Sequence, residues 1–335
     1  MARGRIATAI CIALLASSIA LTASATPGSG KWRVVAKVPG IVDVVGPRAD
    51  GRLVLSTHSG LFVMLPAGPP VPYARGPQGY AGSPGEPYLT LGSGHRVPGA
   101  GCAFRLDVIF ALDPDATPGI VRVDRSGRSS RFANLPAGAF PAGIATDTVG
   151  SFGYRILVTS FSSGTTTFYA LDCRGRARVV ATGAPHVEGG IAVAPRTFGR
   201  FGGKLIATDE VTGRIYAFGP GGRVRLVAES GLPAGGDIGT EALGFVPPKF
   251  GRHFAAYLAD LGSPGSPTSG SDSLLILGGT DLSRANLHAG ELIVATEAGA
   301  KTLAVRCARR CTVHRVADGP AITHAEGHIT FVRRR

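Results

Sequence analysis

Four glutamates and two histidines stand where apolar runs of the sequence begin, and together they have the chemistry of a cation site. They are Glu86, Glu188, Glu241, Glu326, His186 and His324. Two of the glutamates belong to His-x-Glu pairs, and a spacing of two along a β-strand puts both side chains on one face. Carboxylate oxygens suit Ca²⁺ or Mg²⁺, and a neighbouring imidazole also admits Zn²⁺ or Mn²⁺. These residues predict a divalent-cation site, provided that the fold gathers them.

Each of these side chains also has a purely structural interpretation. A glutamate at a repeat boundary can accept backbone N–H groups from the next unit, and a histidine two residues away can be an ordinary loop residue. Asp209 and Asp260 end apolar runs at comparable places, where turn formation is the simpler role. A cation site requires the carboxylates to converge, whereas the structural roles do not. The strands that carry these residues therefore determine which interpretation applies.

The chain from Glu188 to Glu241 contains one complete copy of a repeated unit. Its short apolar runs are rich in Ile, Val, Leu, Tyr and Phe and end at Gly, Pro or Asp, which is typical of strands joined by tight turns. The runs cover 190–194, 204–208, 214–218 and 223–228. Four strands in about fifty residues bury little surface alone, so neighbouring units must stack.

Gly-Arg pairs show that the flanking sequence repeats this unit in register. They occur at Gly127-Arg128, Gly175-Arg176 and Gly222-Arg223, in steps of 48 and 47 residues. Roughly 310 residues follow position 26, which at this period gives about six units. We therefore predict an all-β fold, a six-bladed β-propeller of four-stranded blades, with seven blades as the alternative. The first strand of each blade lines the channel of a propeller, so the glutamates would meet at one channel mouth.

The two ends of the chain follow the repeat less closely. A strand at 32–38 is expected to complete the last blade from its outer side, and blade one is expected over 40–73. We expect blade five to begin at Glu241 and to continue through a strand ending at Asp260 and another at 273–277. Blade six would comprise 291–296, 302–306 and 312–317. The strand at 327–332 has no assigned blade.

The first 25 residues have the pattern of a signal peptide. Arg3 and Arg5 precede an apolar run over 6–21, and small residues at 23–25 offer a cleavage site. We expect residues 1–25 to be removed, 26–31 to form a linker and 32–335 to form a single propeller domain. The protein would then be secreted, and no later stretch is apolar enough to be a transmembrane segment.

Four cysteines remain once Cys11 leaves with the signal peptide, and an even number in an oxidising compartment favours disulfides. A bridge between Cys307 and Cys311 would staple a hairpin, and Cys102 would then pair with Cys173. Three pairings are formally open, and the sequence does not choose among them.

The chain is strongly basic, with a net charge of +13 that falls to +11 when Arg3 and Arg5 leave with the signal peptide. Such a surface attracts anionic partners in general. The arginines are nevertheless scattered over turn positions, and aromatic residues are not interleaved with them as single-strand binding requires. Nucleic acid is therefore not expected as a partner.

Three stretches resemble a known group of propellers. They read EGGIAVAP at 188–195, GGKLIATDEVTGRIYAFGPGGRV at 202–224 and FPAGIATD at 140–147. These segments resemble the repeats of the NHL-repeat and SMP-30/gluconolactonase-like group, and the resemblance extends over about residues 120 to 260. The resemblance implies a divalent ion held in the channel by a glutamate, an asparagine and an aspartate, with Glu188 or Glu241 matching the glutamate. The asparagine has no match, because Asn134 and Asn286 do not fall at a strand entry.

Three functions are compatible with these features. The first is an exported propeller that binds a small molecule, a glycan or an extracellular protein at the acid-lined mouth of the channel. The second is a divalent-metal-dependent hydrolase or lactonase of SMP-30 type, with Glu86, Glu188 and Glu241 as ligands and a histidine as base. The third is a protein-interaction scaffold without a small-molecule site. The sequence contains no Gly-x-Ser-x-Gly elbow and no His-Glu-x-x-His motif.

Overall fold

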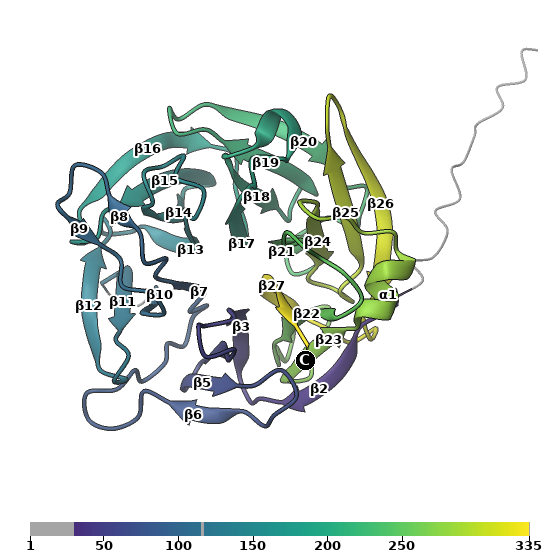
Figure 1. The fold of residues 1–335 in the computed structure, drawn as a ribbon, viewed down its shortest axis with the longest axis horizontal. Coiled ribbons are helices and arrows are strands. Elements are labelled where there is room, and N and C mark those ends of the chain that lie inside the picture. Colours follow the sequence, from purple (N-terminus) through teal and green to yellow (C-terminus); the bar gives the residue numbers. More distant parts are fainter. Residues whose placement is uncertain (1–29, 115–116, 335) are drawn as a thin grey trace, which may run out of the picture.

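The computed structural model describes residues 30–114 and 117–334, which form a propeller-like ring of β-sheets around a central axis (Figure 1). The predicted signal peptide at 1–25 and most of the predicted linker lie outside these residues. Within the described part of the chain, the helical elements are a 3₁₀ turn at Gly199–Phe201 and the short helix α1 at Gly279–Arg284. No helix in this part combines the length and the apolar character that crossing a membrane would require.

Four sheets of the ring have four antiparallel strands each. The first comprises β3 (Ile41–Val45), β4 (Leu53–Thr57), β5 (Gly60–Met64) and β6 (Val71–Tyr73). The second comprises β7 (Leu89–Leu91), β10 (Ile109–Asp113), β11 (Gly119–Val123) and β12 (Ser129–Asn134). The third comprises β13 (Phe140–Thr146), β14 (Ile156–Ser162), β15 (Thr165–Leu171) and β16 (Ala177–Ala184). The fourth comprises β17 (Glu188–Val193), β18 (Leu205–Asp209), β19 (Arg214–Phe218) and β20 (Val224–Glu229).

A nine-stranded sheet completes the ring, in the order β1-β26-β25-β24-β21-β27-β22-β23-β2. One half contains β21 (Thr240–Phe245), β24 (Leu292–Thr296), β25 (Thr302–Cys307) and β26 (Cys311–Asp318). The other half contains β27 (Ala325–Arg333), β22 (Phe254–Asp260) and β23 (Ser273–Leu277). The halves are joined by a single parallel pairing of β21 with β27, at Leu243 and His328.

This pairing corrects the predicted order of the last two blades. We expected the strand that begins at Glu241 to continue into the strands ending at Asp260 and at 273–277, but β21 pairs with β24 instead. Strands β22 and β23 pair with β27, the strand that had no assigned blade. The physical reason is that β27 is long and largely buried, so it occupies the innermost position next to the buried β22.

The N-terminal strands β1 (Gly30–Lys31) and β2 (Arg33–Lys37) close the outer side of the ring. Strand β2 pairs with β23, and β1 runs parallel to β26. The strand predicted at 32–38 is thus an outer strand, but it lies next to β23 and not next to the strands predicted for blade six. Between them, Trp32 is buried and its indole N–H donates to the Thr302 hydroxyl at 2.8 Å. Residues 30–37 therefore fasten both halves of the nine-stranded sheet.

The core lies between the faces of neighbouring sheets. Between the third and fourth sheets, for example, Leu157 and Phe168 pack with Ile191 and Phe218 in one buried cluster. The rings of Phe168 and Phe218 meet edge to face with centroids 5.7 Å apart. Each sheet depends on its neighbours for burial, which is why the repeat must stack to be stable.

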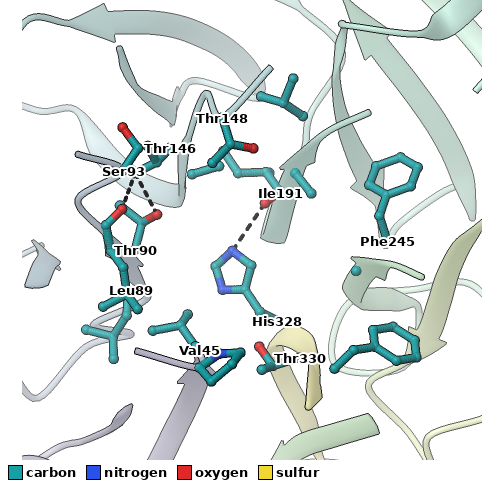
Figure 2. A pocket seen from close by; sticks show the side chains of 18 of the residues that line it. Val45, Leu89, Thr90, Ser93, Thr146, Thr148, Ile191, Phe245, His328 and Thr330 are labelled. Atoms are coloured by element: carbon teal, nitrogen blue, oxygen red, sulfur yellow. Dashed lines mark hydrogen bonds between the residues drawn. The ribbon is translucent and has the colours of Figure 1, made fainter. Parts of the chain in front are cut away.

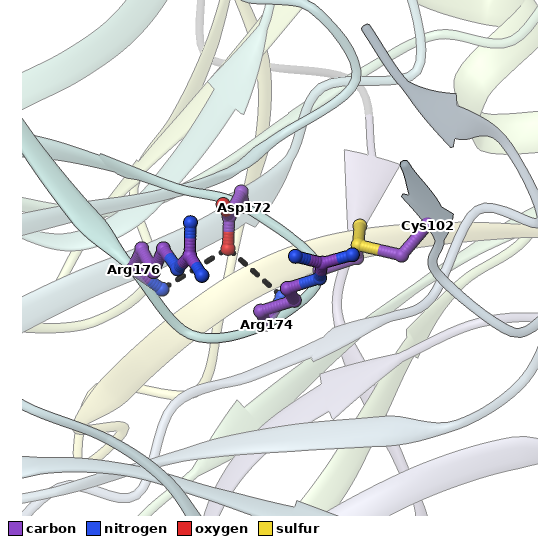
Figure 3. Close-up of a disulfide and its surroundings, with 5 residues drawn as sticks. Cys102, Asp172, Arg174 and Arg176 are labelled. Atoms are coloured by element: carbon purple, nitrogen blue, oxygen red, sulfur yellow. Dashed lines mark hydrogen bonds between the residues drawn. A yellow bond between two sulfur atoms is a disulfide. The ribbon is translucent and has the colours of Figure 1, made fainter. Parts of the chain in front are cut away.

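Two disulfides are present, and they select one of the three pairings left open by the sequence. Cys307–Cys311 closes the hairpin of β25 and β26. Cys102–Cys173 joins the small hairpin of β8 (Arg96–Val97) and β9 (Cys102–Ala103) to the turn after β15. In that turn the Asp172 carboxylate accepts the backbone N–H groups of Arg174 and Arg176 at 2.8 and 3.1 Å (Figure 3). The longer bridge thus links two neighbouring sheets through a well-ordered turn.

Candidate metal centre

The candidate site lies where the innermost strands begin. Glu188 is the first residue of β17, Glu241 lies at the start of β21 and Glu326 at the start of β27, while Glu86 precedes β7. The pairings near these strand starts contain irregularities of register, as between Glu188 and Ala192. Such bulges re-aim the side chains next to them. The sequence thereby directs carboxylates from several sheets to one end of the central channel.

Glycine permits this close approach at two positions. Gly189 follows Glu188 and Gly327 follows Glu326, and both have left-handed backbone conformations, with φ of +77° and +66°. A Cβ atom at Gly189 would collide with the Glu241 carboxylate. The Glu-Gly sequence therefore serves both the backbone conformation and the convergence of the acids.

Tyr88 is the centre of the acidic cluster. Its hydroxyl lies 2.9 Å from Glu86, 3.0 Å from Glu241 and 2.6 Å from Glu326. A phenol has only one proton to donate, so two of these three contacts need a proton on the carboxyl group. The cluster therefore holds protons in the absence of a cation.

A compact triad adjoins this cluster. His324 Nε2 lies 2.8 Å from Glu297 Oε1 and 3.2 Å from Glu326 Oε1, and one ligand atom from each of the three residues lies within 4.8 Å of the others. All three side chains are buried. Asp260 accepts the backbone N–H of His324 at 2.9 Å and so holds the histidine in place.

Several polar atoms of the site have no partner among the described residues. They are Glu241 Oε2, Glu297 Oε2 and His324 Nδ1. Buried polar atoms are normally satisfied, and each exception calls for an explanation. Two carboxylate oxygens and one imidazole nitrogen are thus left to ligate a metal, and these atom types fit the ligand preferences of a divalent cation.

Burial and mutual repulsion raise the pKa values of four acids at this mouth. The pKa of Glu188 is raised to about 9, first by burial and then by the charge of Glu86. The same causes raise the pKa of Glu326 to about 8, and burial followed by Glu297 raises that of Glu210 to about 8. The pKa of Glu241 lies well above its usual range for the same reasons.

The same acidic neighbours favour the charged form of His324. Burial on its own would lower the pKa of its imidazole, but the hydrogen bonds and charges of Glu297 and Glu326 together outweigh burial and raise the pKa to about 10. The imidazolium is then the one cationic side chain bonded directly to the acids of this mouth, among the contacts of the described residues. If all of these acids were ionised, its single positive charge would balance only part of theirs.

The structure brings most of the predicted residues together. Glu86, Glu241 and Glu326 surround Tyr88, and His324 contacts Glu326. The other His-x-Glu pair lies nearer the solvent, with His186 Nε2 3.7 Å from Glu188 Oε2, and neither residue belongs to the triad.

Three residues of the site were not predicted. Tyr88 lies two residues after Glu86, while Glu210 and Glu297 directly follow β18 and β24, the second strands of their sheets. A signal for them was present, because Thr208-Asp209-Glu210 and Ala295-Thr296-Glu297 occupy equivalent places. At the first of these places Asp209 was predicted to form a turn. Its carboxylate accepts the Thr212 hydroxyl at 2.6 Å.

Comparisons with known proteins give no family for this chain. No protein-family model matches the sequence, and no curated protein is significantly similar to it. Solved structures similar to the chain include proteins described as gluconolactonases and as regucalcin, the same group that the sequence resembles.

Three individual structures illustrate the degree of likeness. Virginiamycin B lyase from Staphylococcus aureus is 12% identical with a TM-score of 0.48, over 85% of this chain and 74% of that one. A gluconolactonase from Xanthomonas campestris is 16% identical with a TM-score of 0.42, over 69% of both chains. The calcium-binding protein regucalcin from Agrobacterium tumefaciens is 12% identical with a TM-score of 0.38, over 71% and 74%. At these values the likeness concerns the fold alone.

Proposed function

We propose that this protein is an exported, six-bladed propeller whose acid-lined channel mouth binds a divalent cation and, beside it, a ligand. Six blades follow if the nine-stranded sheet supplies two, since each of its halves contributes one innermost strand, β21 or β27. Export is supported by the signal-like residues 1–25 and by two disulfides. The domain would span 32–335.

One observation carries the metal proposal: Glu297, His324 and Glu326 meet in a buried triad with unpartnered donor atoms. The contacts of Tyr88 require protons on carboxyl groups beside this triad. A divalent ion would displace them and supply the positive charge that the cluster lacks. Because one ligand is an imidazole, we expect Mn²⁺ or Zn²⁺ to bind more tightly than Ca²⁺ or Mg²⁺.

The rim of the mouth is where a ligand would bind. Glu86, Glu188, Glu210 and His186 are only partly buried, so they are open to the solvent at this mouth. A small molecule, a glycan or a loop of an extracellular protein could interact with a bound cation from this side. Nucleic acid is not proposed, because a mouth lined by carboxylates repels phosphates.

Cation binding can be measured by isothermal titration calorimetry on chelator-treated protein, with MnCl₂, ZnCl₂, CaCl₂ and MgCl₂ as separate titrants. We expect one tight site, weakened at least about 100-fold in Glu297→Gln, since even outer-shell partners of a metal contribute roughly 10–100-fold. Glu229→Gln changes an exposed glutamate on β20 and serves as the matched control, with unchanged affinity.

Absence of binding for all four ions would overturn the proposal and leave the interaction scaffold as the better description. Equal weakening in Glu297→Gln and Glu229→Gln would show that the ion binds elsewhere. Circular dichroism of each variant separates a lost site from a lost fold.

A metal-dependent hydrolase or lactonase is the second candidate. It is favoured by Glu188 and Glu210, whose raised pKa values of about 9 and about 8 keep protonated carboxyl groups at the rim of the triad. Groups that titrate near the working pH are suited to acid–base catalysis. With a panel of aldonolactones, we expect Glu188→Gln to reduce turnover by roughly 10²-fold or more, and Glu229→Gln to retain it. No turnover by the metal-loaded protein would exclude this activity for the panel.

A further inference from the structure

A second cavity occupies the opposite mouth of the channel. Its volume is about 550 Å³, and each of the innermost strands β3, β7, β13, β17, β21 and β27 contributes residues to its lining (Figure 2). Along β17, Glu188 lies at the acidic mouth while Ala192 lines this cavity, and four residues of strand span about 13 Å. The cavity is thus separate from the triad, although the same strands build both.

The floor of the cavity is a closed ion pair. His328 Nδ1 lies 2.9 Å from the Asp43 carboxylate, and Nε2 lies 3.1 and 3.2 Å from the carbonyl oxygens of Ile144 and Ile191. Both ring nitrogens are therefore engaged with groups of the protein. Asp43 also accepts the backbone N–H groups of Val44, Leu89 and His328. These polar atoms are bonded within the protein, so the floor offers a ligand few hydrogen bonds.

Three of the five hydroxyl side chains in the lining face the cavity as acceptors. Thr146 donates its proton to the Leu91 carbonyl at 2.8 Å, so the 3.0 Å contact between Thr90 and Thr146 is a donation from Thr90. Thr330 donates to the Val44 carbonyl at 2.7 Å. The protons of all three hydroxyls are therefore committed to the protein, and lone pairs remain. A ligand that brings hydrogen-bond donors would complement these three hydroxyls.

The remaining lining is largely apolar and carries little charge. Phe245 and Phe331 add aromatic surface, and Asp107 is the carboxylate of the lining. Asp107 already accepts the backbone N–H of Ala49 at 3.0 Å. An ammonium ligand would lose much of its hydration among these apolar side chains, which is costly at every position away from Asp107. Neutral donors, above all hydroxyl groups, meet the wall without that penalty.

We propose that this cavity binds a neutral saccharide, one or two rings in size. A sugar ring combines several O–H donors with an apolar C–H face, which matches threonine lone pairs set among aromatic and aliphatic side chains. The volume is within the usual range for small-molecule sites. This site goes beyond the cation-dependent function proposed for the acidic mouth and does not depend on it.

The proposal is tested by saturation-transfer difference NMR and calorimetry on the full chain, in the presence of chelator. The probes are cellobiose and diacetylchitobiose, and the matched control is per-O-methylated cellobiose, which keeps the rings and has no donors. We expect binding of at least one disaccharide and none of the methylated sugar. Thr148→Trp, at an exposed position on the rim, and Thr330→Val should each weaken binding at least tenfold.

Two control variants locate the binding site. Thr165→Val changes an exposed threonine of β15, and Glu297→Gln changes the acidic mouth, and both should leave saccharide binding unchanged. The proposal is overturned if neither disaccharide binds, if the methylated sugar binds equally well, or if Thr148→Trp has no effect. Loss of binding in Glu297→Gln but not in Thr148→Trp would place the sugar at the acidic mouth and overturn it as well. Thr148→Trp keeps the test valid should Thr330→Val fail to fold.

Discussion

Replacing Asp43 by alanine is expected to lower the free energy of unfolding by about 3–5 kcal/mol, because it leaves a buried charge without its partner. Asp43 is fully buried and bonds to β3, β7 and β27 at once, through Val44, Leu89 and His328. Its loss would leave three backbone N–H groups and the His328 imidazolium without their acceptor. Urea unfolding at pH 7 measures the effect.

Asp50→Ala is the matched control for this experiment. Asp50 lies in the exposed turn between β3 and β4, where its carboxylate accepts the N–H of Arg52 at 3.0 Å. Exposed substitutions usually change stability by no more than about 0.5 kcal/mol. If Asp43→Ala cost no more than Asp50→Ala, the ion pair with His328 would not be a structural link between the innermost strands.

The four-stranded sheets were predictable because their information is local. Strands β17 to β20 lie close to the predicted runs, since alternating apolar residues and glycine turns specify hairpins whose partners are adjacent in sequence. The pairing of β21 with β24 could not be found in this way. Phe245 pairs with Leu292, and β22 and β23 lie between them in the chain. In that arrangement β22 pairs with β27 from the end of the chain, and this contact between distant segments leaves no local signal in the sequence.

The candidate site was predictable to the extent that it lies at strand starts. The repeat placed Glu86, Glu241 and Glu326 at equivalent positions, and the ring brings them together around Tyr88. Glu297 enters the site from the end of a second strand, which the repeat did not mark as facing the channel. Asp43 and His328 were missed as a pair because 285 residues separate them.

The stability of the cation-free protein is expected to fall as pH rises from about 5 to 9. The pKa of Glu188 is about 9 in the folded protein against an ordinary value of 4.5, and that of Glu326 is about 8. Between these limits the folded state binds more protons than the unfolded state, so the free energy of unfolding decreases with pH. His324 acts in the same direction, since its pKa is raised from 6.5 to about 10. Each proton of difference is worth about 1.4 kcal/mol per pH unit.

Urea unfolding at unit steps from pH 5 to 9, with chelator present, would measure this slope. Glu188→Gln removes one titrating carboxyl, so the slope should become shallower by up to about 1.4 kcal/mol per pH unit. The exposed Glu229→Gln variant should retain the original slope. A saturating cation would replace the protons and flatten the profile, because it binds the ionised acids of the folded state. A profile that is flat or rising in the cation-free protein would mean that the acids at this mouth are already ionised, and the place assigned to the cation would lose its electrostatic basis.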